Sequence, residues 1–306
     1  MRTCLCLSLL LAAACLASQT PAERLGYGPD EKLLIVHADD LGVTHATNTA
    51  SFAGLRRGSI SSASVMANTA WLPEVARFAR ENPSADLGMH LTLTSEWPDL
   101  KWGPVAGAGR VPSLVDSAGY LPDNCAAVAQ NADPEEVRTE LIAQIERARK
   151  LGIIPTHLDT HMGCLMATPA FFTTYLETGR AYNIPTMLPQ EDLQRLAPGL
   201  LELTTGEDLL IDRLFMAEPA DHAGGLSNYY RKVLTELPPG INLLIIHTAV
   251  DGAESGAMAA GTVAYGNAWR QDDYDFVTGE SFTELLAEQN IRLVTWRELA
   301  ERRKRR

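Results

Sequence analysis

The most constraining feature of this sequence is an unbroken aliphatic run, residues 33–36, that leads to the adjacent pair Asp39 and Asp40. A strand buried on both faces, as in a parallel sheet covered by helices, has this composition. Because neighbouring side chains of a strand point to opposite faces, two consecutive aspartates can face one site only where the strand ends. Gly42 follows the pair, where the backbone can turn. The sequence therefore predicts a carboxylate pair at the carboxyl end of a parallel strand, where α/β enzymes hold their active sites.

A simpler explanation is that the two aspartates belong to the turn before the next helix, with Asp40 or Thr44 as its N-cap. Other aliphatic runs that end in histidine favour a functional role instead. These histidines are His90, His157 with His161, and His247. Carboxylates and histidines at the ends of several strands are the side chains from which metal sites are built.

Two of these histidine-bearing segments read as strands with one polar face. In residues 87–94 the polar face carries His90, which needs either a metal or a hydrogen bond within the core. In residues 153–161 a period of two brings three side chains to one face. They are His157, Asp159 and His161. Three ligand-type side chains on one face indicate a metal site more strongly than a single histidine does.

Strands and helices alternate from residue 33 to the end without a linker, which predicts one domain of βα units. The number of units, about seven, suits a barrel better than an open sheet. Helices are expected over 44–57, 71–81, 133–151, 168–182, 227–236, 281–289 and 296–304, and further strands over 60–66, 184–188, 241–247 and 291–295. Residues 191–214 fit no element, and the Gly/Ala-rich residues 248–266 are expected to form a loop over the site.

Residues 95–131 form a long irregular stretch with several prolines and glycines. Long loops inside a domain are usually functional. Its tryptophans, Trp97 and Trp102, have two plausible uses. They either lie against the C–H face of a sugar or fix the loop to the body of the domain.

Composition limits the classes of partner. The chain has 306 residues, 46% of them hydrophobic, which is enough for the core of one large domain. Its formal net charge of −12 argues against nucleic acid and anionic membranes as partners, but not against a neutral sugar. No glycine-rich phosphate loop follows the first strand, which argues against a nucleotide-binding fold of that kind.

The N-terminal residues 1–20 have the pattern of a secretory signal peptide, with an apolar stretch too short to span a membrane. We therefore expect an exported protein, periplasmic or extracellular, with no membrane span. In a lipoprotein variant, Cys15 would carry the lipid anchor. Only Cys125 and Cys164 remain beyond this segment, and the sequence does not decide whether they pair.

Three motifs, residues 38–42, 88–91 and 155–161, resemble those of the YdjC-like carbohydrate deacetylases in residue type, order and spacing. The end of the chain resembles the family more weakly, through His247, Arg270, Asp272 and Asp273, and residues 291–298. The resemblance implies an α/β fold, a distorted TIM-like (β/α) barrel over residues 30–306, related in design to polysaccharide deacetylases.

The resemblance also implies a site for one divalent metal ion, and the ligand types allow Mg²⁺ or Zn²⁺. The expected metal ligands are Asp40, His90 and His161, the expected base is Asp39 and the expected acid is His247. From their place beside the ligands, His157 and Asp159 are expected to orient them or to replace one of them. The chain departs from the family at Leu41, at residues 162–166 and at residues 248–249. These departures remove side chains expected near the substrate but no expected ligand.

The function expected from these residues is a metal-dependent hydrolase that removes acetyl groups from N-acetylated sugars or oligosaccharides. Two alternatives stay open at this point. One is a metal-independent glycoside hydrolase that uses Asp39 and a second carboxylate. The other is an exported sugar-binding protein without catalytic activity. The expected partner is a small molecule or an oligosaccharide, and a homodimer is compatible with the sequence.

Overall fold

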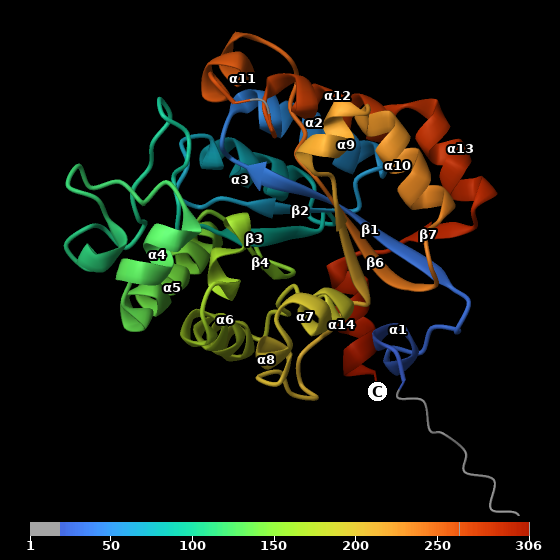
Figure 1. Cartoon of the computed structure of the whole chain (residues 1–306), viewed down its shortest axis with the longest axis horizontal. Coiled ribbons are helices and arrows are strands. Elements are labelled where there is room, and N and C mark those ends of the chain that lie inside the picture. Colours follow the sequence, from blue (N-terminus) through green and yellow to red (C-terminus); the bar gives the residue numbers. More distant parts are fainter. Residues whose placement is uncertain (1–18, 263, 306) are drawn as a thin grey trace, which may run out of the picture.

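The long strand β1 (Lys32–Leu41) lies in the middle of a parallel sheet that helices surround (Figure 1). The computed structural model describes residues 19–262 and 264–305. The expected signal peptide lies outside the described residues up to position 18, and so does the lipidation candidate Cys15. Among the helices that the structure describes, none combines the length and the apolar character needed to cross a membrane.

The other strands are β2 (Ser62–Val65), β3 (Leu87–Leu91), β4 (Leu158–Thr160), β5 (Arg213–Met216), β6 (Gly240–Ile246) and β7 (Ile291–Leu293). The first helices are α1 (Pro21–Arg24), α2 (His45–Arg57), α3 (Leu72–Glu81), α4 (Cys125–Asn131), α5 (Pro134–Lys150), α6 (Pro169–Tyr182), α7 (Gln190–Leu196) and α8 (Pro198–Leu201). They are followed by α9 (Pro219–Ala223), α10 (Leu226–Thr235), α11 (Ala253–Met258), α12 (Asn267–Thr278), α13 (Glu280–Glu288) and α14 (Trp296–Lys304). Two 3₁₀ helices are η1 (Pro112–Leu114) and η2 (His161–Met166).

The sheet closes into a distorted barrel. All its pairings are parallel, in the order β4-β3-β2-β1-β6-β5, with β7 paired to the first residues of β1. The segment between the outer strands β4 and β5 closes the barrel. Isolated bridges join Leu158 of β4 to Thr186 in this segment, and Pro189 to Ile211, which lies just before β5. This arrangement confirms the predicted α/β barrel class.

The two faces of β1 pack in different layers. Leu34 and Val36 belong to the large cluster between the sheet and the helices. Leu33 and Ile35 point the other way and pack in a second cluster with Trp296 of α14. Because side chains alternate along a strand, this second cluster fills the barrel interior at the amino ends of the strands. The next side chains on this inward face of β1 are the polar His37 and Asp39, so the polar part of the barrel interior lies next to this apolar cluster.

Several predicted boundaries were wrong where elements are short. Residues 153–161 contain only the three-residue strand β4, and residues 184–188 contribute a single bridge instead of a strand. Residues 191–214, for which the sequence predicts no element, contain most of α7, all of α8 and the start of β5. The loop predicted over 248–266 contains α11. Such elements are too short to show a period in the sequence. They form because contacts with neighbouring segments stabilise them.

The irregular stretch 95–131 contains η1 and α4 and packs on the body of the domain. Both tryptophans are buried, with their rings 5.5 Å apart at 72°. The indole N–H of Trp102 donates to the Thr94 carbonyl at 2.8 Å. The structure therefore supports the second of the two uses: these rings fix the loop to the domain.

A disulfide bond joins Cys125, the first residue of α4, to Cys164 in η2, with their Cα atoms 4.9 Å apart. The pairing left undecided by the sequence is thereby decided in favour of a bond. The bond spans 39 positions and fixes the 95–131 stretch to the segment that begins at His161.

Replacing both cysteines, Cys125→Ala with Cys164→Ala, should lower the free energy of unfolding by up to about 4 kcal/mol, because the bond restricts the unfolded chain. Urea denaturation with and without reductant measures the effect. Reductant should destabilise the wild type and leave the double variant unchanged. Equal midpoints for the oxidised wild type and the variant would contradict the prediction.

Gly88 in β3 provides the space for the ring of His157, since a Cβ at this position would overlap that ring. Gly88→Ala should therefore destabilise the fold by about 1–3 kcal/mol, the usual range for an overpacked core. Gly109→Ala is the matched control, because, apart from its chain neighbours, no residue that the structure describes lies within 4 Å of its added Cβ. Chemical denaturation of both variants tests the prediction, which fails if Gly88→Ala is as stable as the control.

Candidate functional site

The two aspartates of β1 face the same side because the strand carries a β-bulge. Ala38 pairs with Ala63 and Leu41 pairs with Val65, so β1 has one extra residue in this interval. Asp40 adopts the left-handed conformation, with φ of 69°. The pair lies at the end of the strand, as predicted, because β1 ends at Leu41. The sequence did not predict the bulge, which re-aims the side chain of Asp40, as bulges near active sites often do.

Of the two N-cap candidates for α2, Asp40 and Thr44, the structure has Thr44 in that role. Its hydroxyl accepts a hydrogen bond from the Thr47 N–H and caps α2. Asp40 does not cap this helix, so both carboxylates are available to the site.

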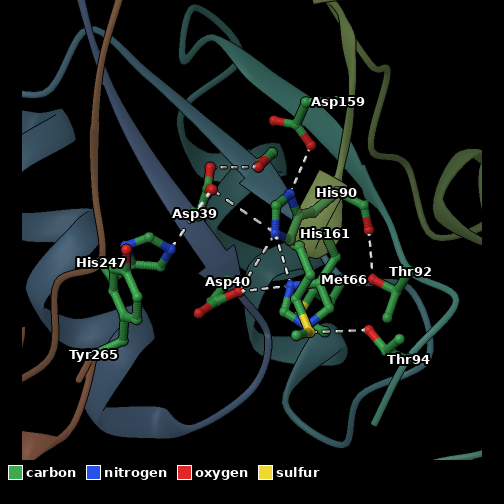
Figure 2. A network of polar contacts seen from close by, with 12 residues as sticks. Asp39, Asp40, Met66, His90, Thr92, Thr94, Asp159, His161, His247 and Tyr265 are labelled. Carbon is green, nitrogen blue, oxygen red and sulfur yellow. Dashed lines mark hydrogen bonds and ion pairs between the residues drawn. The ribbon is translucent and has the colours of Figure 1, made fainter. Parts of the chain in front are cut away.

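Asp40, His90 and His161 meet at the carboxyl ends of β1, β3 and β4 (Figure 2). Oδ1 of Asp40 lies 3.4 Å from Nε2 of His90 and 3.5 Å from Nδ1 of His161. The two histidine nitrogens are 3.1 Å apart. Oδ1 of Asp40 is buried and has no hydrogen-bond partner in the part of the chain that the structure describes. A buried carboxylate oxygen without a partner is costly, which points to a cation at this place.

The other nitrogen of each histidine contacts a carboxylate. Nδ1 of His90 lies 2.6 Å from Oδ1 of Asp159, and Nε2 of His161 lies 3.0 Å from Oε2 of Glu96. Such contacts fix the tautomer of a histidine so that its free lone pair faces a metal. Glu96 was missed in the sequence because the strand was predicted to end at residue 94. Continuing its period of two from His90 would have reached Glu96.

The three inward-facing atoms fit one divalent ion. Ligands bound at roughly 2.0–2.1 Å in tetrahedral or octahedral geometry lie roughly 3.0–3.4 Å from one another. The separations here are 3.1, 3.4 and 3.5 Å. The chemistry also fits, since imidazole and carboxylate are ligands that such ions accept.

Arg270 of α12 holds the second oxygen of Asp40. Its Nη2 donates to Oδ2 of Asp40 at 2.7 Å, and its Nε donates to the Tyr265 carbonyl at 2.7 Å. Burial alone would raise the pKa of Asp40, but the Arg270 guanidinium and the contact with His90 hold that pKa well below its usual range. Asp40 is therefore ionised at neutral pH, the form that binds a cation.

Asp39 lies beside the trio formed by Asp40, His90 and His161. Its two carboxylate oxygens have different surroundings. Oδ1 accepts a hydrogen bond from the Ser64 hydroxyl at 3.3 Å and lies 3.1 Å from Nε2 of His37. Oδ2 lies 3.8 Å from Nε2 of His90 and 3.7 Å from Nε2 of His247 (Figure 2). One oxygen is thus anchored in the barrel interior, and the other faces the trio.

His247 follows β6, and its backbone N–H donates to Oδ2 of Asp273 at 2.8 Å. Its ring packs against Tyr265, with ring centroids 4.9 Å apart. Burial lowers the pKa of His247 to about 4, against the opposing charges of Asp40 and Asp39. The imidazole is therefore neutral at pH 7, and it can act as an acid only after it takes up a proton.

His157 and Asp159 occupy different positions relative to the trio. Asp159 contacts His90, as described, whereas the ring of His157 stacks on Trp296 at 5.1 Å. His37, for which the sequence motifs predict no role, lies instead between Asp39 and Asp159. The sequence could have indicated His37 through the strand period of two, which places it on the same face of β1 as Asp39.

Proteins named carbohydrate deacetylase are similar to this chain. One of them, from Thermus thermophilus, is 35% identical over 291 residues, 91% of this chain and 97% of that protein. A second protein of that name, from Thermoanaerobacter pseudethanolicus, is 28% identical over 165 residues, 54% of this chain and 64% of its own length.

A solved structure from Enterococcus faecalis, described as a putative cellobiose-phosphate cleavage protein, has the same fold. Its TM-score is 0.74 at 24% identity, with 88% of this chain and 99% of that chain covered. The family described as YdjC-like protein matches residues 33–288, from the first core strand to the end of α13. With that match over most of its length, this chain belongs to the YdjC-like protein family.

Proposed function

We propose that this protein is a metal-dependent hydrolase that removes acetyl groups from N-acetylated sugars or oligosaccharides. One observation carries the proposal: the ligand atoms of Asp40, His90 and His161 face a common point, while the other nitrogen of each histidine contacts a carboxylate. Membership of the family and a nearly full-length relative named carbohydrate deacetylase support the choice of substrate class.

The proposed metal is one divalent ion, Zn²⁺ or Mg²⁺, held by these three residues. Such an ion would polarise the amide carbonyl and make a water molecule more acidic. The protein fixes the ligands in the geometry that this chemistry needs, because Asp159 and Glu96 hold the two imidazoles and Arg270 keeps Asp40 ionised. Three protein ligands leave space around an ion for water and substrate.

Asp39 and His247 are proposed to handle the protons. Oδ2 of Asp39 faces the trio and would accept the proton of the attacking water. Nε2 of His247 lies 3.7 Å from the same oxygen, so His247 can receive a proton there and deliver it to the leaving amine. A histidine that starts neutral and is charged only during the reaction fits the low pKa of His247.

Export of the protein is also part of the proposal, on the strength of its N-terminal sequence. The bond between Cys125 and Cys164 supports this location, because disulfides persist in oxidising compartments and are rare in the cytosol.

The role of the trio can be tested with His161→Ala and Asp40→Ala, which should both lose bound metal and activity, because each removes a ligand. Asp39→Asn should keep the metal and lose at least about 100-fold in rate, the usual contribution of a general base. Metal content by mass spectrometry and acetate release from a panel of N-acetylated mono- and oligosaccharides measure both effects.

His45→Ala serves as the matched control, because His45 is an exposed histidine on α2 that should affect neither metal nor rate. Asp40→Ala also leaves the buried Arg270 without its carboxylate, so circular dichroism must show that this variant folds. His161→Ala tests the ligand role independently, because it leaves the ion pair between Asp40 and Arg270 in place. Metal retained by folded His161→Ala, or full activity in Asp39→Asn, would contradict the assigned roles. A metal-loaded wild type that releases no acetate from any sugar would contradict the proposed function.

A further inference from the structure

His37 is a fully buried histidine on the inward row of β1, two positions before Asp39. Its Nδ1 lies 3.2 Å from the Ser62 hydroxyl. Its Nε2 has three neighbours: Oδ2 of Asp159 at 2.8 Å, Oδ1 of Asp39 at 3.1 Å and the Ser64 hydroxyl at 3.2 Å. One ring nitrogen thus lies between two buried carboxylates that act on different parts of the site.

The carboxylates determine how this nitrogen is protonated. A carboxylate accepts hydrogen bonds, so Nε2 must carry a hydrogen to bond Asp159 and Asp39. Burial by itself would lower the pKa of His37, but the hydrogen bonds to Asp159 and Asp39 outweigh it and raise the pKa to about 9. A charged His37 compensates two carboxylates that would otherwise repel each other in a low-dielectric interior.

A second ion at this cluster is a competing explanation. Ligand atoms of His37, His157 and Asp159 lie within 4.8 Å of one another. However, 2.8 Å between Nε2 of His37 and Oδ2 of Asp159 is a hydrogen-bond distance, whereas two ligands of one ion lie roughly 3 Å or more apart. The observed contacts fit a hydrogen-bonded anchor better.

We propose that His37 is a positioning residue for the reaction proposed above, on which this inference rests. It holds Oδ1 of Asp39 in the barrel interior, so that Oδ2 is the oxygen presented to the attacking water. The same N–H anchors Asp159, which orients the ring of His90. His37 thereby sets the geometry of the base and of one metal ligand together, without contacting substrate or metal itself.

Two amide variants of different length test this role. In His37→Gln the side-chain NH₂ can occupy the place of Nε2 and donate to both carboxylates. In His37→Asn the amide is one methylene shorter and falls short of them. We expect His37→Asn to lose about 10- to 100-fold in kcat with little change in KM, as for other residues that orient metal ligands. His37→Gln should recover most of this loss, and both should keep one metal ion per chain.

Crystal structures of the two variants give a readout that does not depend on activity. Asp39 should rotate away from its wild-type orientation in His37→Asn and keep it in His37→Gln. Equal kcat in both variants, or an unmoved Asp39 in His37→Asn, would overturn the inference. Loss of a second ion per chain in either variant would overturn it in favour of the competing metal site. If the wild type itself shows no acetate release, the proposed function fails while the orientation of Asp39 still tests the anchor.

Discussion

The extra residue in β1 is the constraint on which the rest of the site depends. In a regular strand Asp39 and Asp40 would point to opposite faces, one into the barrel and one into the helix layer. The bulge and the left-handed conformation of Asp40 turn both toward the carboxyl end of the barrel. This backbone conformation is unfavourable for a residue with a side chain, and it persists because the ion pair with Arg270 holds Asp40 in place.

Several carboxylates lie close together in the barrel interior, where they repel one another, and neighbouring cationic side chains compensate their charge. Asp40 is paired with Arg270, and Asp159 and Asp39 share His37. Each pairing leaves one oxygen of the carboxylate available for a further contact. Oδ1 of Asp40 faces the common point, and Oδ1 of Asp159 contacts His90. Stability and site geometry therefore depend on the same contacts, since an unpaired charge here would be strongly destabilising.

The sequence was most informative where local pattern and chemistry coincide. The aliphatic runs of β1 and β6 are confirmed as strands, and the period of two placed His90 and Asp159 on inward-facing positions of their strands, where the two side chains contact each other. Information was lacking where tertiary contacts decide the outcome. The bulge at Asp40 leaves no mark in residue type, and nothing local indicates that Cys125 reaches Cys164. His37 and Glu96 lay within the informative period but outside the motifs that carried the family resemblance.

The way the barrel closes has a consequence for its internal motions. From β4 around to β5 the ladder of hydrogen bonds is continuous, but the remaining side is held by bridges at Leu158–Thr186 and Pro189–Ile211. Segments with few backbone pairings open at the lowest free energy, so this seam is where transient local opening would begin. Asp159 directly follows Leu158 in the chain, so each opening of the seam would loosen the carboxylate that orients His90. At the proposed metal site, affinity for an ion would then vary with how firmly this seam is held.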